Sequence, residues 1–347
     1  MAPADRTLDL VNIPSESGSE AEIYAYVRAT APLPEVFSDG ETVLFATRSG
    51  KPLVLLAGHF DTVPAQNNIP GRIDDGKVFG LGASDMKGGL AVMIELAHWA
   101  TTADLAYDLG LLFFPREELG PAHNPLPGVF ERAPLIDEAA LVVCLEPTDN
   151  TLQLGCLGNL VARVVFDGRS AHSARPWLGV NAIALAFGGL KDVLTLQPVD
   201  VEVGGLVFRE VLSVTQLNAG IAANVIPARA EAILNFRYAP NRSPEEAVVR
   251  VRELVGVEIE VLSNSPPAHV ASESQVVQAL REAGGFEVQP KQAWTNVADF
   301  AARGLDAVNL GPGATRYAHA QDEQVEIAEL ERTLAALKQF LASVEGS

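Results

Sequence analysis

The chain has 347 residues, of which 48% are hydrophobic and 20% charged, so its length predicts about two globular domains. With 25 Lys and Arg residues against 44 Asp and Glu residues, its formal net charge of -19 argues against nucleic acid and anionic membranes as partners. Two separated cysteines predict neither a disulfide framework nor a thiolate metal site. The N-terminus lacks a signal-peptide pattern, and no run of about eighteen apolar residues occurs, so we expect a cytoplasmic protein.

Apolar runs alternate with a helical pattern in the first part of the chain. Residues 52–60, 107–114 and 139–145 are predicted to form buried strands, and residues 83–102 an amphipathic helix. Strands that alternate with helices indicate an α/β layer with a mainly parallel sheet. Ligands of such sheets bind beyond the carboxyl ends of the strands, so the residues that follow these runs are candidates for a functional site.

A different pattern begins near residue 158. Strand patterns in LVARVVFDG, EVLSVTQLNAG and ARAEAILNFRYAP alternate with a helix over 181–194 and another that begins near Ser243, which predicts a small antiparallel α+β domain of the ferredoxin-like type. A helix over 272–282, the strand-like AVNLG and a closing helix from Ile327 then return to the first domain. The predicted first domain is therefore discontinuous, with residues 1–157 and 268–347, and the second domain covers residues 158–267.

Five potential metal ligands follow apolar runs or turns across most of the chain, in the order His59, Asp85, Glu118, Glu146 and His319. Two imidazoles and three carboxylates suit a pair of zinc ions, because Asp85 can bridge both ions while each takes one His and one Glu. The three carboxylates would balance most of the charge of two zinc ions. We therefore predict a dizinc site.

The motif HFDTVP places Asp61 two residues after His59. On an extended backbone both side chains point to the same face, so Asp61 can orient the imidazole, although a His-x-Asp found by itself is usually a solvated turn. The run GLGASDMKGG lacks the third glycine of a dinucleotide fingerprint and the Gly-Lys-Ser/Thr of a phosphate loop. It is better explained as a tight turn, in which Gly80 and Gly82 allow unusual backbone angles and deliver Asp85 to a metal.

Glu117 and Glu118 are consecutive, and a loop can direct them to different tasks. We assign Glu118 as a ligand and Glu117 as the general base, which takes a proton from water and delivers it to the leaving amine. A solvated acidic pair is the alternative. His172, flanked by small residues and Arg175, could donate a hydrogen bond to a developing oxyanion, whereas a structural or surface role is the simpler explanation of a single histidine.

Arg237 in NFRY and Asn224 in ANVIP are candidates for holding a substrate carboxylate. A strand-edge arginine and a turn asparagine explain these two residues equally well on composition. The remaining histidines have no comparable neighbourhood and are expected to be structural.

Taken together, GHFDTVP, GASDMKGG, the Glu-Glu pair, LEPT and AHAQDE resemble, in order and approximate spacing, the M20 family of dizinc amidohydrolases and exopeptidases. The resemblance covers nearly the entire chain. Within the family it is strongest to succinyl-diaminopimelate desuccinylases, through AHSARPWLGVNAI, ANVIP, NFRYAPNRS and AWTNVADFAARGLDAVNLGPG. It implies a zinc-exopeptidase-like catalytic domain interrupted by a lid domain that also forms a homodimer.

The resemblance also implies roles for single residues. His59, Asp85 and Glu146 would hold one zinc ion, and Asp85, Glu118 and His319 the other, with Co2+ as a possible substitute for Zn2+. Glu117 falls on the general base of the family and Asp61 on its supporting carboxylate. His172 matches a histidine that reaches the active site of the neighbouring subunit. Substrate contacts are implied near Asn224, Arg237, Thr295 and Gly313.

Three positions depart from the family pattern. Arg116 precedes the acidic pair where a small or acidic residue is more usual, Asn296 stands where Asp is common, and GATRYAH replaces a Gly-Asp segment before the last ligand. None of them changes the predicted metal ligands. They bear on which acyl group and which amine the protein accepts.

The resemblance implies hydrolysis of a small anionic N-acyl amino acid, with N-succinyl-LL-2,6-diaminopimelate as the leading substrate and succinate and LL-2,6-diaminopimelate as products, a step of lysine and diaminopimelate biosynthesis. Arg175, Arg237 and Arg316 could supply the positive charge that such a substrate needs. Another M20 deacylase or peptidase, such as an acetylornithine deacetylase or a dipeptidase, is the first alternative. The second is a non-catalytic binding protein on the same fold, which would be expected to lack a ligand or the base.

Overall fold

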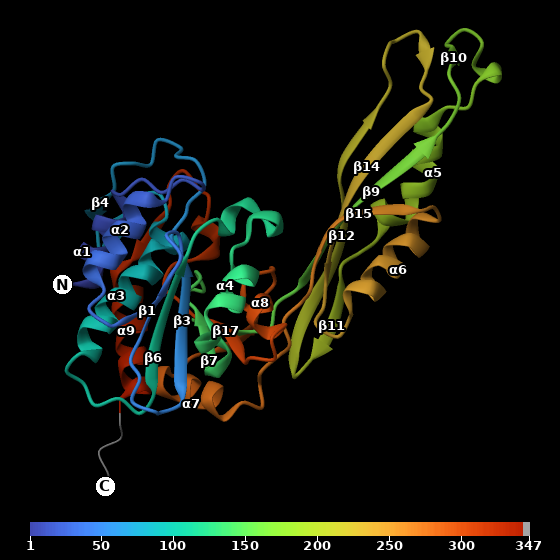
Figure 1. Ribbon diagram of the computed structural model, residues 1–347. Helices are drawn as coiled ribbons and strands as arrows, with labels where there is room; N and C mark the ends of the chain where they lie inside the picture. The colour runs from blue at the N-terminus through green and yellow to red at the C-terminus, as the bar shows by residue number, and fades with distance from the viewer. Residues whose placement is uncertain (343–347) are drawn as a thin grey trace. The chain divides into compact units, whose positions relative to one another are not determined.

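The computed structural model describes residues 1–342 and separates them into two units (Figure 1). Among the described residues, the first unit consists of Met1–Leu154, Ala271–Gln289 and residues 299–342, and the second of Gly155–Val270 and Pro290–Ala298. The segment 290–298, which the sequence pattern assigned to the first domain, belongs to the second unit. The segment is held there by hydrogen bonds within that unit: Leu157 N donates to Ala293 O at 3.2 Å, and the indole Nε1 of Trp294 donates to Pro266 O at 3.1 Å.

The first unit is built on a mixed sheet with the strand order β1-β2-β6-β3-β7-β17-β8-β16. Its strands are β1 (Glu35–Ser38), β2 (Val43–Ala46), β3 (Leu53–His59), β6 (Asp108–Phe114), β7 (Ala139–Cys144), β8 (Leu152–Leu154), β16 (Val288–Pro290) and β17 (Ala307–Asn309). β3 pairs in parallel with β6 and with β7, and β17 pairs in parallel with β7, whereas β1, β2 and β8 join by antiparallel pairs. The centre of the sheet is therefore parallel, as the alternation of strands and helices predicts.

Helices cover both faces of this sheet. They are α1 (Pro3–Val11), α2 (Ala21–Thr30), α3 (Gly88–Ala100), α4 (Leu126–Arg132), α7 (Gln275–Gly284), α8 (Val297–Ala301, which crosses the boundary between the units) and α9 (Ile327–Leu341). α3 packs against β3 and against α1 and α9, while α4 lies on the opposite side of the sheet in Figure 1. Nearly every side chain of α3 is buried, because the helix lies between the sheet and other helices.

Short elements complete the first unit. A small antiparallel sheet has the order β18-β5-β4, and its strands are β4 (Arg72–Asp74), β5 (Lys77–Phe79) and β18 (Gln324–Glu326). The helical turns are η1 (Ala83–Lys87), η2 (Glu117–Leu119), η3 (Pro121–His123), η4 (Pro134–Glu138) and η6 (Thr315–Tyr317). The predicted helix over 83–102 begins only at Gly88, because Asp85 and Met86 have non-helical backbone angles.

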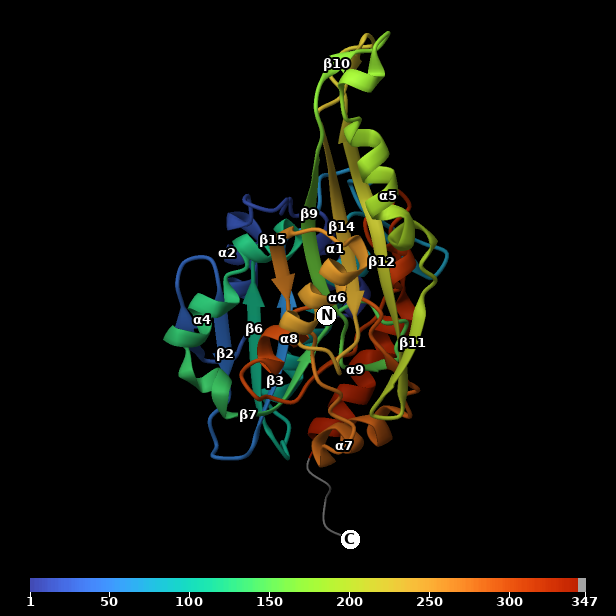
Figure 2. The same cartoon turned by 90° about the vertical axis from the view of Figure 1, so that its right-hand side faces the viewer.

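The second unit is an antiparallel sheet with the order β11-β12-β14-β9-β15, covered on one face by two helices, as Figure 2 shows. The elements are β9 (Gly158–Asp167), β10 (Ala171–His172), η5 (Pro176–Leu178), α5 (Ala182–Thr195), β11 (Val199–Val203), β12 (Leu206–Ala219), β13 (Val225–Ile226), β14 (Arg229–Tyr238), α6 (Pro244–Val255) and β15 (Ile259–Ser265).

The succession β9, α5, β12, β14, α6, β15, with β9 and β14 central in the sheet, confirms the ferredoxin-like prediction, and β11 extends one edge. Alternate residues of β9, from Leu160 to Phe166, are buried against α5 and α6, so the helices cover the apolar face. Asn181 caps α5 and Ser243 forms a capping box with Glu246 at the start of α6. Among the residues described, no helix combines the length and the apolar character that crossing a membrane requires.

Candidate metal centre

Three of the predicted site segments meet because they follow neighbouring parallel strands. β3 ends at His59, which pairs in register with Phe114 at the end of β6, and Ala57 pairs with Cys144 at the end of β7. The chain leaving β6 carries Glu117 and Glu118, and the chain leaving β7 carries Glu146. Parallel strands direct their carboxyl ends to one edge of the sheet, so these carboxylates gather around His59.

Asp85 reaches the same place through the glycine-rich turn before α3. Gly80 and Gly82 have φ values of 143° and 78°, which favour glycine, so the predicted unusual backbone angles are present. A Cβ added at Gly82 would lie 2.9 Å from the Thr62 side chain, so the turn also needs glycine for space. The tight turn thus brings the Asp85 carboxylate to the end of β3.

Asp85 lies between the two histidines, one on each carboxylate oxygen. Its Oδ1 is 3.2 Å from His59 Nε2 and its Oδ2 is 3.7 Å from His319 Nε2. His319 Nε2 also lies 3.0 Å from the Glu118 carboxylate. This is the arrangement that a carboxylate shared between two cations requires.

The ligand atoms form overlapping groups in which all members lie within 4.8 Å of one another. One group is His59, Asp85 and Glu146, and another is Asp85, Glu118 and His319; a further possible group joins His59 to Glu117 and Glu118. The first two groups are the triads implied by the family resemblance. Their donors, imidazole nitrogen and carboxylate oxygen, are those that zinc accepts, so the residues present fit two such ions.

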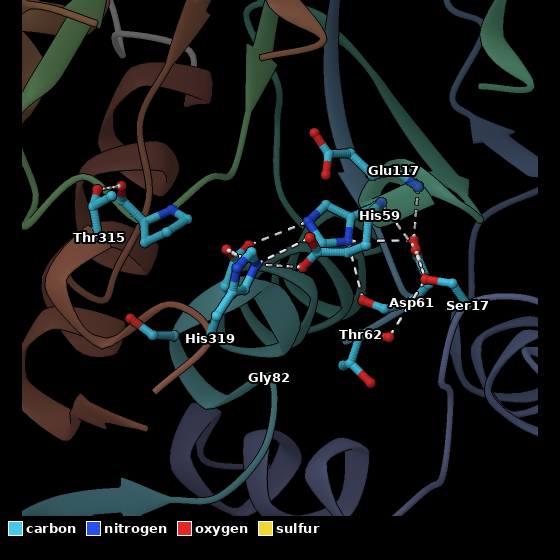
Figure 3. Close-up of polar contacts among 12 residues, drawn as sticks. Ser17, His59, Asp61, Thr62, Gly82, Glu117, Thr315 and His319 are labelled. Atoms are coloured by element: carbon cyan, nitrogen blue, oxygen red, sulfur yellow. Dashed lines mark hydrogen bonds and ion pairs between the residues drawn. The ribbon is translucent and has the colours of Figure 1, made fainter. Parts of the chain in front are cut away.

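Asp61 contacts both His59 and the backbone of the acidic pair. Its carboxylate has no solvent exposure and accepts hydrogen bonds from Ser17 Oγ at 2.6 Å, Glu117 N at 3.1 Å and Glu118 N at 3.2 Å. Its Oδ1 is 3.4 Å from His59 Nδ1. Burial raises the pKa of Asp61, but the interactions with His59 and Ser17 outweigh it and hold the pKa below its usual range. Asp61 is thus a charged group that fixes both the imidazole and the acidic pair (Figure 3).

The electrostatics of the acidic pair show an excess of negative charge. Burial raises the pKa of Glu117 well above its ordinary value. The neighbouring carboxylates Glu146 and Glu118 raise it further, and the His59 imidazole opposes the shift. Burial and the Asp85 carboxylate raise the pKa of Glu118, although His59 and His319 oppose the shift. For His59, burial lowers the pKa, but Asp61, Asp85 and Glu146 raise it well above the ordinary value. Such a cluster favours cations, which would relieve the repulsion.

The loop of His319 is held by two side chains that the sequence gave no reason to select. Gln66 Nε2 donates to His319 O at 2.9 Å and Asn68 Nδ2 donates to Ala320 O at 3.3 Å. His319 itself has φ 60° and its side chain is 52% exposed. The last ligand is therefore positioned by its backbone rather than by burial.

Glu323 is the largest omission of the sequence-based assignment. Its carboxylate accepts backbone hydrogen bonds from Gly82 at 2.8 Å, Ser84 at 3.0 Å and Asp85 at 2.9 Å, and so clasps the turn that carries Asp85. Burial raises the pKa of Glu323 to about 7, although the backbone hydrogen bonds oppose the shift. Glu323 ends the motif AHAQDE, in which the sequence-based assignment gave a role only to His319. Ser17 was also missed, because an isolated serine carries no pattern.

Two further residues of the first unit have clear structural partners. Gly313 has φ 82°, and a Cβ there would lie 2.4 Å from Ser84 Oγ, beside the Asp85 turn. Its amide donates to Glu329 Oε2 at 2.7 Å. Arg316 Nη1 donates to Asp149 at 3.0 Å. The position of Gly313 next to the turn explains the glycine without any contact to substrate.

Arg116, the departure before the acidic pair, is bound to a distant carboxylate. Its backbone has φ 62°, a conformation that residues other than glycine rarely adopt. Its two terminal nitrogens donate to the two oxygens of Glu41, at 3.0 and 2.7 Å. This bidentate pair neutralises Arg116 locally and ties the chain immediately before Glu117 to the turn between β1 and β2.

The predicted oxyanion residue and the predicted substrate residues other than Gly313 lie in the second unit. His172 in β10 pairs with Val225 in β13, and Asn224 O accepts from Ser173 N at 2.9 Å, so His172 and Asn224 are neighbours there. His172 Nδ1 accepts a hydrogen bond from Ala174 N at 3.0 Å. Arg175 is exposed in the same loop. The structure therefore groups these three residues, and their contribution to the metal centre stays a prediction.

Arg237 lies elsewhere in this unit, on β14, where it lines a cavity of about 280 Å3 with Leu157, Arg209 and Gln292 among its other walls. Its Nε donates to Asn235 Oδ1 at 3.0 Å, and burial lowers its pKa. Thr295 and Asn296 are both buried. A partly desolvated guanidinium that faces a cavity is suited to bind a carboxylate.

Comparison with known proteins agrees with this site. The model of peptidase family M20/M25/M40 matches residues 55–343, so the chain belongs to this family of metal-dependent hydrolases. A putative succinyl-diaminopimelate desuccinylase of Mycobacterium tuberculosis is 38% identical over 347 residues, covering 98% of each chain. The succinyl-diaminopimelate desuccinylase of Corynebacterium glutamicum is 38% identical, covering 98% of this chain and 96% of the relative.

Solved structures show the same fold at lower identity. An aminopeptidase, PepT, of Bacillus cereus superposes with a TM-score of 0.79 at 20% identity, covering 98% of this chain and 97% of that one. A tripeptidase of Staphylococcus aureus also gives a TM-score of 0.79, at 19% identity, with the same coverage. At this identity the likeness establishes the fold alone.

Proposed function

We propose that the protein is a dizinc amidohydrolase that cleaves N-succinyl-LL-2,6-diaminopimelate into succinate and LL-2,6-diaminopimelate. The observation that carries the reaction type is the pair of triads that share Asp85, with the carboxylate of Glu117 beside them. The relatives that are 38% identical over nearly the entire chain support the choice of substrate. Membership of a hydrolase family supports catalysis over simple binding, since all predicted ligands and the base are present.

In this proposal His59, Asp85 and Glu146 hold one ion, and Asp85, Glu118 and His319 hold the other. When bound, zinc supplies Lewis acidity at the scissile carbonyl and makes water a better nucleophile at neutral pH. Glu117 accepts the proton of the attacking water and passes it to the leaving amine nitrogen. A carboxylate beside the ions is suited to both halves of this task, because it can take up a proton from water and release it to the amine.

Asp61 keeps His59 in place during the reaction, because it contacts the imidazole on one side and the backbone of the acidic pair on the other. Arg237 is the proposed partner of a substrate carboxylate. The neighbouring Arg209 is already paired with Asp200 at 2.7 Å, which leaves Arg237 as the cation of that cavity with donors to offer. Replacing Arg237 with Ala is expected to raise KM more than it lowers kcat.

The deciding experiment is a substrate panel on one zinc-loaded sample whose metal content is measured. Succinyl-diaminopimelate, N-acetylornithine and a simple dipeptide are compared by kcat/KM, with Co2+ tested as a replacement for Zn2+. We expect succinyl-diaminopimelate to be the best substrate. No release of succinate would reject the proposed substrate, and hydrolysis of another panel member would assign the chain to a different M20 activity. No hydrolysis of any amide by fully loaded protein would favour the binding-protein alternative.

We further propose that the second unit forms a homodimer. α5 exposes Phe187 by 72% and Ile183 by 49%, and the adjoining turn exposes Trp177 by 73%. Large apolar groups gathered on one helix and its neighbouring turn are typical of a contact surface. Phe187→Glu is expected to yield monomers in sedimentation analysis, while Val249→Glu, on an exposed position of α6, leaves the dimer intact. Monomers of the unaltered protein would contradict the proposal.

The resemblance assigns His172 to the active site of the neighbouring subunit, and a mixing experiment tests this. His172→Ala and Glu117→Ala should each lower turnover with zinc content unchanged. Heterodimers of the two variants would contain one site with both residues intact and should recover part of the activity. Failure to recover any activity in verified heterodimers would argue against shared sites.

A further inference from the structure

A second cavity in the first unit contains none of the proposed metal ligands. It has a volume of about 360 Å3 and its walls are mainly apolar, with Val11, Ile13, Pro14, Ile69 and Leu81 among them. A cavity of this size falls in the range of small-molecule sites, which are mostly apolar with a few well-placed polar groups.

The polar group of this cavity is a buried lysine. Lys87 is 2% exposed, and its Nζ donates to Ile13 O at 2.8 Å. An ammonium has three donors, so one acceptor leaves two of them available. Within residues 1–342 no carboxylate lies within 4.0 Å of Lys87 Nζ, although Glu323 acts on it from farther away. A buried amine with two spare donors and no carboxylate within reach can bind an anionic group.

Ser15 provides a second polar group on the same wall. It is 2% exposed, and among the described residues its hydroxyl has no hydrogen-bond partner. Glu16, the acidic residue of the lining, is exposed and does not pair with Lys87. The cavity thus combines an apolar wall with an amine and a hydroxyl that both lack full partners.

We propose that this cavity binds a small amphiphilic carboxylate, with the carboxylate at Lys87 and the apolar chain against Val11, Ile69 and Leu81. The carboxylate would accept hydrogen bonds from the spare donors of Lys87, and the chain would exclude water from the walls. Either a free fatty acid or the carboxyl end of an apolar peptide has this chemistry. The proposal concerns binding and does not depend on the substrate of the metal centre.

The cavity is connected to the metal centre through backbone contacts. Ser15 O accepts from Thr62 N at 2.9 Å, and Ser17, two residues along, donates to Asp61. Lys87 follows Asp85 by two residues. A ligand in the cavity would therefore contact the segments that position Asp61 and Asp85.

The test is direct binding of hexanoate, measured by calorimetry on chelator-treated and on zinc-loaded protein. Saturable binding to both forms in the millimolar range is expected, as befits so small a ligand. The uncharged hexanamide, and acetate, which lacks the chain, should each bind at least tenfold more weakly. N-acetylleucine is included as a model of a peptide carboxyl end, and the tighter of the two carboxylates identifies the source of the natural ligand.

Two variants locate the site independently. Lys87→Met keeps the shape of the side chain but removes the charge, and Ile69→Trp fills the mouth of the cavity, where Ile69 is 46% exposed. Each should weaken hexanoate binding at least tenfold. Ile73→Trp, at a similarly exposed isoleucine outside the cavity, should leave binding unchanged. Binding that occurs only with zinc, or that survives both cavity variants, would overturn the proposal, as would no saturable binding at all.

Discussion

Ser17→Ala tests how strongly the buried carboxylate under the metal centre depends on one hydroxyl. Ser17 Oγ donates to Asp61 Oδ2 at 2.6 Å, the shortest of the hydrogen bonds that Asp61 accepts, and Asp61 is fully buried. A hydrogen bond to a charged group contributes about 1.5–3 kcal/mol, and water cannot replace it at a buried oxygen without local rearrangement. We expect the free energy of unfolding of the metal-free protein to fall by about that amount.

The same substitution should also weaken the binding of zinc. Asp61 orients His59, and removal of an outer partner of a ligating histidine typically lowers metal affinity about 10- to 100-fold. Zinc affinity is measured by competition with a chromophoric chelator, and stability by urea unfolding of the metal-free form. Ser19→Ala, at an exposed serine of the same loop, is the matched control. If Ser17→Ala matched Ser19→Ala in both measurements, the support assigned to Asp61 would be wrong.

Four other outcomes are expected. Glu117→Ala should lower turnover about 100-fold or more with full zinc content, and retained turnover would remove the assignment as base. Arg116→Ala and Glu41→Ala should lower turnover by similar factors, and a double variant that loses the product of both factors would show that the ion pair does not act as a unit. Glu323→Gln should weaken zinc binding, because both carboxylate oxygens accept hydrogen bonds from the turn that carries Asp85 and the NH2 group of Gln cannot accept; unchanged zinc affinity would contradict this role of Glu323. Burial raises the pKa of Asp108, but backbone and hydroxyl hydrogen bonds to it outweigh burial and lower the pKa, so its stabilisation is present above pH ~4 and is lost as the pH falls through the folded value. The difference in unfolding free energy between Asp108→Asn and the parent should therefore shrink below pH ~4, and a constant difference would exclude the ionised state as its source.

Much of the architecture could be predicted because the strands that position the site are continuous apolar runs. The predicted strand over 52–60 is observed as β3 over Leu53–His59, and the one over 139–145 as β7 over Ala139–Cys144. His59 lies at the end of the first run and Glu146 directly follows the second, so the position of the site followed from strand ends. The three-residue strands β4, β5 and β18 have no period to detect and were not predicted.

The supporting residues could not be predicted, because their partners are remote in the chain. Ser17 meets Asp61 across 44 residues, Arg116 meets Glu41 across 75, and Glu323 meets the amide of Asp85 across 238. Nothing local distinguishes such a serine or glutamate from a solvated one. The predicted start of the helix at residue 83 was wrong, because the turn that carries Asp85 interrupts a pattern that is otherwise helical up to Ala100.

β17 has a consequence for how the chain is made. This strand pairs with β7 on one side and β8 on the other, so the central sheet has a gap until residues 307–309 leave the ribosome. Residues 155–270, by contrast, form a contiguous block with its own apolar interior. Residues 155–270 can thus fold during synthesis, before β17 is available to complete the sheet of the first unit. A nascent chain arrested before residue 307 should resist protease within the inserted block and remain sensitive in the segment that precedes it.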